Sequence, residues 1–134
     1  MKILYFKLRA VVVTWLMRLL PRNPPIVYKG INSALTLCEQ VAVLGYNKVL
    51  LVTDHFLDSS GLLDCIKATL QKVGVEFLVY DGVLPDPAFD QVQAGEAMLR
   101  SGHCTALIAV GGGSVLDAAK MMAMLHNNPG DLKS

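Results

Sequence analysis

Acidic residues are scarce at the start of this chain, since none precedes Glu39 and Asp54 is the next one. Cysteine is also scarce, because Cys38, Cys65 and Cys104 are odd in number, widely spaced and form no C-x-x-C pair. This pattern argues against a disulfide framework and a zinc knuckle. It favours reduced thiols and therefore predicts a cytoplasmic protein.

Metal-ligand spacing and nucleic-acid features are absent as well. His55, His103 and His126 form no H-x-x-x-H or related pattern, so we predict no metal site within this chain. The formal net charge is +1 and no basic stripe follows residue 30, so we predict no nucleic-acid partner. With 134 residues, 53% hydrophobic and 17% charged, the chain is expected to form one core-rich domain rather than a disordered segment.

Residues 1–25 differ from the rest, because basic side chains alternate there with apolar ones. The longest apolar stretch, Ala10 to Met17, is too short to span a bilayer, and no small-residue cleavage site precedes Pro24-Pro25. We predict a basic amphipathic helix in this segment. It would pack on the parent protein or a partner subunit, or residues 1–22 would lie on a membrane surface; composition favours packing.

From residue 26 onward, apolar runs of strand length alternate with helical patterns. The predicted strands are Ile26–Tyr28, Val49–Thr53, Val75–Tyr80 and Thr105–Val110. The predicted helices run from Asn32 or Ser33 to about Leu44, from Ser59 or Ser60 to about Lys72 or Val73, from Phe89 to Ser101 and from Ser114 to about His126. Such alternation implies right-handed βαβ units. We therefore predict an α/β fold, a Rossmann-like three-layer αβα arrangement with a mostly parallel sheet, over residues 26–134.

Three consecutive glycines, Gly111, Gly112 and Gly113, follow the last predicted strand and precede a helix. Backbone without side chains can approach a ligand closely, and a helix start offers unpaired N–H groups that attract phosphate. Ser114 and Asp117 have the spacing of a capping box, so Ser114 is expected to cap this helix. The turn is neither G-x-G-x-x-G nor a P-loop. Its local chemistry still predicts a pyrophosphate site.

The ends of three predicted strands carry turn or polar residues: Thr53-Asp54-His55, Asp81 to Pro87, and Gly111 to Ser114. In a parallel sheet these ends meet at one edge, where ligands of open α/β sheets bind. Asp54 could accept hydrogen bonds from the ribose hydroxyls of an adenosine and repel a 2′-phosphate, which favours NAD over NADP. The alternative is that Asp54 is a solvated loop acid.

The last predicted helix carries two further features with alternative interpretations. Lys120, three residues after Asp117, would form either a surface ion pair or part of a buried polar cluster near a cofactor. Met121, Met122 and Met124 are expected to fill the core rather than form a functional stripe.

The run from Gly111 to Lys120, Gly-Gly-Gly-Ser-Val-Leu-Asp-Ala-Ala-Lys, resembles the G-G-G-S-x-x-D-x-A-K signature of the iron-containing alcohol dehydrogenases. Leu50 to Asp54 is similar to that family's first nucleotide-binding strand and its acid, and Pro85-Asp86-Pro87 is similar to its Pro-Asn-Pro loop. Residues 26–130 follow the family's order without a gap. Two departures are Asp86 in place of asparagine, which puts a cofactor contact there in doubt, and Thr105 where aspartate is common.

The resemblance implies an N-terminal domain for NAD(P) and a C-terminal helical domain holding a divalent metal, iron or zinc. Gly112, Gly113 and Ser114 would hold the pyrophosphate, Asp54 would meet the adenosine ribose, and Asp117 would lie towards the nicotinamide. The family's metal ligands do not occur in this sequence. We therefore expect the cofactor-binding part of a longer enzyme, inactive alone, whose parent moves hydride between an alcohol or aldehyde and NAD.

Two alternatives to this function stay open. One is a glycerol-dehydrogenase-like or dehydroquinate-synthase-like relative, and the other is a non-catalytic nucleotide-binding module. Assembly into a homo-oligomer also stays open.

Overall fold

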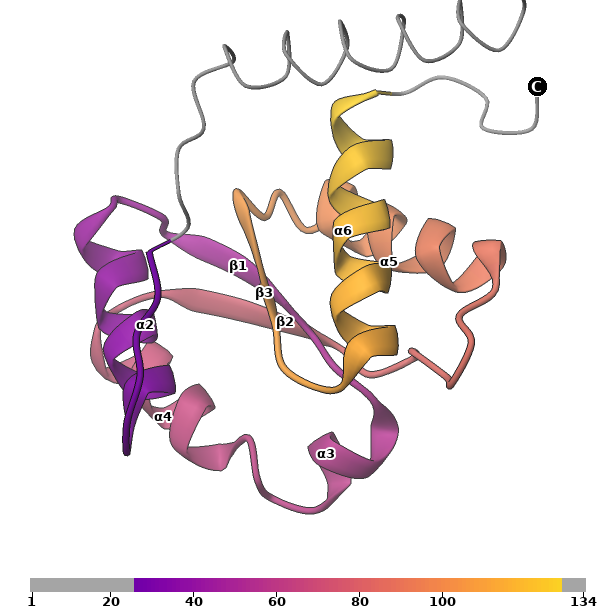
Figure 1. Cartoon of the computed structure of the whole chain (residues 1–134). Coiled ribbons are helices and arrows are strands. Elements are labelled where there is room, and N and C mark those ends of the chain that lie inside the picture. The colour runs from indigo at the N-terminus through magenta and orange to yellow at the C-terminus, as the bar shows by residue number, and fades with distance from the viewer. Residues whose placement is uncertain (1–25, 129–134) are drawn as a thin grey trace, which may run out of the picture.

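The computed structural model describes residues 26–128, so the amphipathic helix predicted for residues 1–25 lies outside the described residues. Figure 1 shows a small parallel sheet with helices on both faces and one short helix beyond the ends of the strands. The elements in chain order are α2 (Ser33–Val43), β1 (Lys48–Val52), α3 (His55–Ser59), α4 (Asp64–Lys72), β2 (Glu76–Tyr80), α5 (Phe89–Ser101), β3 (Ala106–Ala109) and α6 (Gly113–Asn127).

The three strands pair in the order β2-β1-β3, and both pairings are parallel. Val49 of β1 aligns with Phe77 of β2 on one side and with Ala106 of β3 on the other. The predicted α/β fold with a parallel sheet is therefore confirmed. The predicted strand ends differ from the observed ones by a single residue at most positions.

Strand β1 is buried on both faces because its side chains alternate between two helical layers. Leu50 and Val52 pack with residues of α5 and α6, whereas Val49 and Leu51 pack with residues of α2 and α4. All four side chains have no exposed surface. An uninterrupted apolar run is thus what a central parallel strand requires.

From β1 the chain passes to β2 on one side of it, and from β2 it crosses to β3 on the other side of β1. The connection from β1 to β2 contains α4 on one face, and the connection from β2 to β3 contains α5 on the opposite face. Strand order therefore reverses between β1 and β3. At such a point the two carboxyl-terminal loops diverge to opposite faces and leave a crevice between them.

Two sequence-based predictions of elements are wrong. Ile26 to Tyr28 do not form a strand, and Ile26 and Val27 are 82% and 63% exposed, because no strand of the described residues pairs with them. The helix predicted to start at Ser59 or Ser60 and to end at about Lys72 or Val73 instead starts at Asp64, as α4, and it follows a separate short helix, α3, that was not predicted. Gly61, with φ of 76°, lies between them in a left-handed conformation that a helix cannot continue through.

The methionines of α6 correct the prediction that all three fill the core. Met122 has no exposed surface, but Met121 and Met124 are 39% and 64% exposed. Helix α6 buries one stripe, which consists of Val115, Ala118, Ala119 and Met122 at helical spacing. Met121 and Met124 lie off this stripe.

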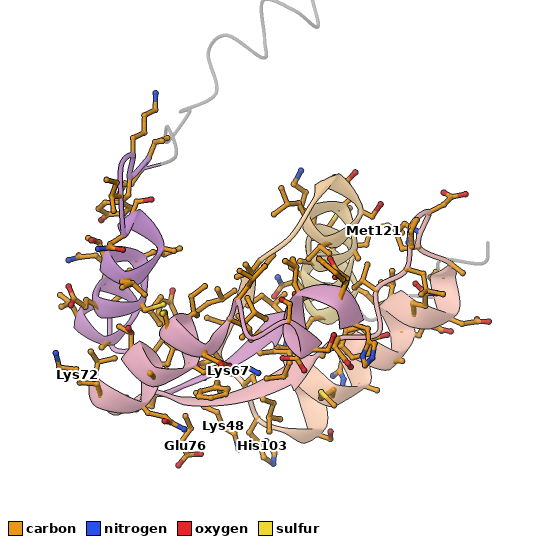
Figure 2. All side chains as sticks on the ribbon, turned by 90° about the horizontal axis from the view of Figure 1, so that it is seen from below. Lys48, Lys67, Lys72, Glu76, His103 and Met121 are labelled. Atoms are coloured by element: carbon orange, nitrogen blue, oxygen red, sulfur yellow. The ribbon has the colours of Figure 1, made fainter. Side chains whose placement is uncertain are left out.

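Ion pairs add electrostatic links between elements. Lys48 and Glu76 lie next to each other at the starts of β1 and β2, with Nζ and Oε2 3.6 Å apart (Figure 2). The Glu76 side chain is 77% exposed, so this pair contributes little to stability.

A more enclosed cluster of three charged or titratable side chains joins α5 to α6. Oε1 of Glu96 on α5 accepts hydrogen bonds from Arg100 of the same helix at 2.6 Å and from the His126 ring of α6 at 3.0 Å. Burial opposes ionisation of Glu96, but these two bonds outweigh it and lower the pKa of the carboxyl. The charge of Glu96 is therefore compensated where the two helices meet.

We expect this cluster to make stability depend on pH. Because the pKa of Glu96 is lowered on folding, its contribution is present above its ordinary pKa of 4.5 and is lost as the pH falls further. Glu96→Gln should reduce the free energy of unfolding at pH 7 by about 1–3 kcal/mol and flatten its decline below about pH 4.5. Urea denaturation at several pH values measures both effects. Glu76→Gln is the exposed control, and an equally steep decline in Glu96→Gln would contradict the assignment.

Candidate functional site

A groove of about 370 Å³ lies at the carboxyl-terminal edge of the sheet. It is lined from three directions, by the segment after β1, the segment after β2 and the glycine turn after β3. The lining residues are Asp54, His55, Phe56, Val83, Leu84, Pro85, Gly112, Gly113, Ser114 and Val115. The predicted convergence of three strand ends is therefore observed, and the groove opens where strand order reverses.

Two other hollows, of about 460 and 440 Å³, lie towards the amino-terminal ends of the strands. Residues Gly74 to Leu78 line one, and residues Cys104 to Leu107 line the other. Neither contains a helix N-terminus with a glycine turn. The groove at the carboxyl-terminal edge is smaller, but it combines open backbone, a carboxylate and an imidazole, and is the better candidate on chemical grounds.

Thr53 holds the two loops of the crevice at a fixed separation. Its Oγ1 donates to the Val110 carbonyl at 2.9 Å, and its side chain is completely buried. Thr53 immediately precedes Asp54, and Val110 immediately precedes Gly111. This bond therefore links the residues that directly follow β1 and β3, at the point where each chain segment enters the groove.

Asp54 caps the short helix α3. Its Oδ1 accepts a hydrogen bond from the Leu57 amide at 2.9 Å, and its backbone is extended, as an N-cap requires. The interpretation of Asp54 as a merely solvated loop acid is therefore wrong. No hydrogen bond among the described residues engages Oδ2, so one oxygen of this groove-lining carboxylate is free to accept from a ligand.

The three glycines of the turn have different surroundings. A Cβ on Gly111 would come within 2.6 Å of the Val115 side chain, so the fold itself requires glycine there. A Cβ on Gly112 or Gly113 would meet no atom within 4 Å, and neither residue has a positive φ. Folding therefore does not explain Gly112 and Gly113. The open backbone at these two positions permits close approach by a ligand.

Helix α6 begins one residue earlier than predicted. Gly112 is its N-cap, in extended conformation, and Ser114 lies within the first turn and makes no capping hydrogen bond. The predicted capping role of Ser114 is wrong, because the helix starts at Gly113 and moves Ser114 past the cap position. The amide groups of the first turn thus stay available at the groove.

Asp117 lies outside the groove lining. Its Oδ1 is 3.3 Å from Lys120 Nζ, and the two side chains are 70% and 74% exposed. The surface ion pair predicted as one alternative is observed, and the buried polar cluster is wrong because this face of α6 is open to solvent. The structure thus brings together Asp54, Gly112, Gly113 and Ser114, but not Asp117.

The groove-lining residue His55 forms a pair with Asp81 that the sequence did not reveal. His55 Nδ1 and Asp81 Oδ2 are 2.9 Å apart, and an antiparallel bridge joins Asp54 to Gly82 beside them. The hydrogen bond to Asp81 raises the pKa of His55, and the same bond lowers the pKa of Asp81. The only sequence signal for this pair was that both residues follow strands expected to end at the same edge.

The backbone conformation at Asp86, rather than a contact with the groove, accounts for the residue type at this position. It has φ of 59° and does not line the groove. Aspartate and asparagine are the side chains that best tolerate this left-handed conformation. The departure from the Pro-Asn-Pro pattern therefore leaves the turn intact.

Two absences bound the chemistry of the part of the chain that the structure describes. No group of three or more His, Cys, Asp or Glu side chains within residues 26–128 is arranged to hold a metal ion. In the same residues, none of the helices combines the length and apolarity needed to cross a bilayer.

Comparison with known proteins places this geometry in context. The family model described as iron-containing alcohol dehydrogenase matches residues 24–134. A choline dehydrogenase from Bacillus subtilis is 33% identical over 109 residues, which is 81% of this chain and 27% of that protein. A crystal structure of 1,3-propanediol oxidoreductase has 34% identity and a TM-score of 0.77, covering 82% of this chain and 29% of the other.

NADH-dependent butanol dehydrogenase A from Thermotoga maritima has 28% identity and a TM-score of 0.76, covering 84% of this chain and 28% of that one. The chain thus spans little more than a quarter of the length of the relatives it matches.

The different surroundings of the glycines predict different tolerances to alanine. Gly111→Ala should lower the free energy of unfolding by about 1–3 kcal/mol, because the new methyl overpacks against Val115. Gly113→Ala should leave stability unchanged or raise it by up to about 1 kcal/mol, because alanine favours a helix. Denaturant titrations of both variants measure this difference. Equal losses would show that the two glycines do not differ in their role in folding.

Proposed function

The chain belongs to the iron-containing alcohol dehydrogenase family, and from this premise we propose that its groove binds the pyrophosphate and adenosine ribose of NAD. The observation that carries the proposal is the open space around Gly112 and Gly113, because folding does not require glycine at either position. These glycines adjoin the exposed N-terminus of a 15-residue helix, where backbone N–H groups and the helix dipole favour an anion.

The proposed roles follow the groove from the turn outward. Backbone amides of Gly113 and Ser114 hold the pyrophosphate, and the missing side chains at Gly112 and Gly113 allow close approach. The free oxygen of Asp54 accepts from a ribose hydroxyl while the other oxygen keeps α3 capped. Asp117, exposed and one turn further along α6, is proposed to lie towards the nicotinamide.

The proposed activity of the whole protein is hydride transfer between an alcohol or aldehyde and the nicotinamide, the chemistry that NAD supplies when bound. The name of the NADH-dependent butanol dehydrogenase supports this choice of cofactor. Residues 26–128 contribute binding and orientation. They contain no cluster of metal ligands, so we assign no step through a metal to them and propose that this part is inactive alone.

Binding can be tested on the chain itself by calorimetric titration with NAD and with ADP-ribose. We expect both to bind, since both carry the pyrophosphate, and we expect Gly113→Ala to weaken both by about tenfold, because a methyl occupies the space of the phosphate oxygens. Adenosine, which lacks the pyrophosphate, should bind the two proteins equally. If neither NAD nor ADP-ribose binds the native chain at about 10 mM, the proposed site is wrong.

The charge of Asp54 should govern the choice between NAD and NADP. Asp54→Asn keeps an N-cap side chain of nearly equal quality but removes the carboxylate that repels a 2′-phosphate. We expect the preference for NAD over NADP to fall by about tenfold, with stability nearly unchanged. Asp90→Asn, a change of charge at an exposed residue outside the groove lining, is the control. An unchanged preference in Asp54→Asn would show that Asp54 does not face the ribose.

A further inference from the structure

The groove contains one basic side chain among its described lining residues, that of His55. It directly follows Asp54, the residue proposed to hold the ribose. Nucleotide sites that accept a 2′-phosphate place a cation beside that position, usually an arginine. No arginine or lysine of the described residues lines this groove, so the imidazole is the only side chain there that could supply such a charge.

The His55 ring is oriented by its neighbour and accessible on its other side. Nδ1 lies 2.9 Å from Asp81 Oδ2, and the side chain is 81% exposed. When one ring nitrogen is bound to a carboxylate, the tautomer is fixed and the other nitrogen is the remaining contact point. In the protonated ring, Nε2 is an N–H donor. In the neutral ring with hydrogen on Nδ1, it is an acceptor and would repel a phosphate oxygen.

Resting on the function proposed above, we propose that His55 reads the 2′ position of the adenosine ribose, with protonated Nε2 donating to a 2′-phosphate while Asp81 holds Nδ1. Asp54 opposes that phosphate by its charge, and His55 opposes it only when neutral. The site would therefore prefer NAD strongly in alkaline solution and admit NADP as the ring gains a proton.

The acidic groups around the ring favour its protonated form. Asp81 at the end of β2 is hydrogen-bonded to the ring, and Asp58 on α3 also faces it; both raise the pKa of His55. Lys67 on α4 pairs with Asp58, its Nζ lying 2.6 Å from Oδ1, and it also acts on Asp81. The two acids therefore raise the pKa of the ring, and Lys67 helps to keep Asp81 ionised by lowering the pKa of its carboxyl.

The test is the ratio of the dissociation constants of NADP and NAD, measured by titration calorimetry between pH 6 and pH 8.5. A ratio cancels any effect of a variant on folding or on the shared part of the ligand. A 2′-phosphate also gains a proton near pH 6, and this lowers the ratio without any help from His55. His55→Gln measures that background, because glutamine keeps a polar side chain that does not titrate.

For the native chain we expect the ratio to fall with decreasing pH by about fivefold more than in His55→Gln. His55→Lys should show a low ratio at pH 8.5 as well, because its charge persists there. Asp81→Asn should move the midpoint of the pH profile to lower pH, since the neutral amide no longer stabilises the charged ring. A merely structural role for the His55–Asp81 pair would move none of these ratios.

Identical pH profiles for the native chain and His55→Gln would overturn this assignment while leaving NAD binding in place. Failure of the native chain to bind NAD would instead overturn the proposed function. The two failures are therefore distinguishable in a single set of titrations.

Discussion

The burial of β1 between two parallel strands is the constraint on which the rest of the structure depends. Its four apolar residues, from Val49 to Val52, have no exposed surface, so helices must cover both faces of the sheet. The chain meets this requirement by running α4 along one face and α5 along the other. Strand order then reverses beside β1, and a crevice opens between the loops after β1 and β3. The groove is thus a consequence of how the core is buried.

Within that crevice, folding and ligand binding place separate demands on adjacent residues. Gly111 is needed because Val115 packs against it, whereas Gly112 and Gly113 face open space. Thr53 joins the two loops by donating a hydrogen bond to the Val110 carbonyl. The buried positions hold the turn by packing and by a hydrogen bond, and the exposed ones leave its backbone accessible. Such a division lets a site be preorganised without being filled by its own side chains.

Much of this arrangement could be predicted from the sequence, because apolar runs of strand length alternate with helical periodicity. The strands around Leu50, Val79 and Ile108 and the convergence of their ends followed from that pattern. The predictions that failed concerned elements that depend on residues distant in sequence or on a single helix cap. Ile26 to Tyr28 has strand-like composition but no partner strand in the described residues. The separate helix α3 depends on the Asp54 cap and on Gly61, which periodicity does not detect.

The carboxylate of Asp54 joins local structure to the proposed function. One oxygen accepts from the Leu57 amide at the start of α3, and the other is the one that accepts from a ribose hydroxyl in our proposal. A five-residue helix has little stability of its own, so its order depends on this cap and on the bridge between Asp54 and Gly82. His55 is the first residue of that helix, and its position beside Asp81 follows from the same cap. The residue that contacts the ribose in our proposal therefore also positions the residue that reads its 2′ substituent. Any change that breaks the cap alters both interactions, whereas asparagine at position 54 separates the charge of the carboxylate from its capping role.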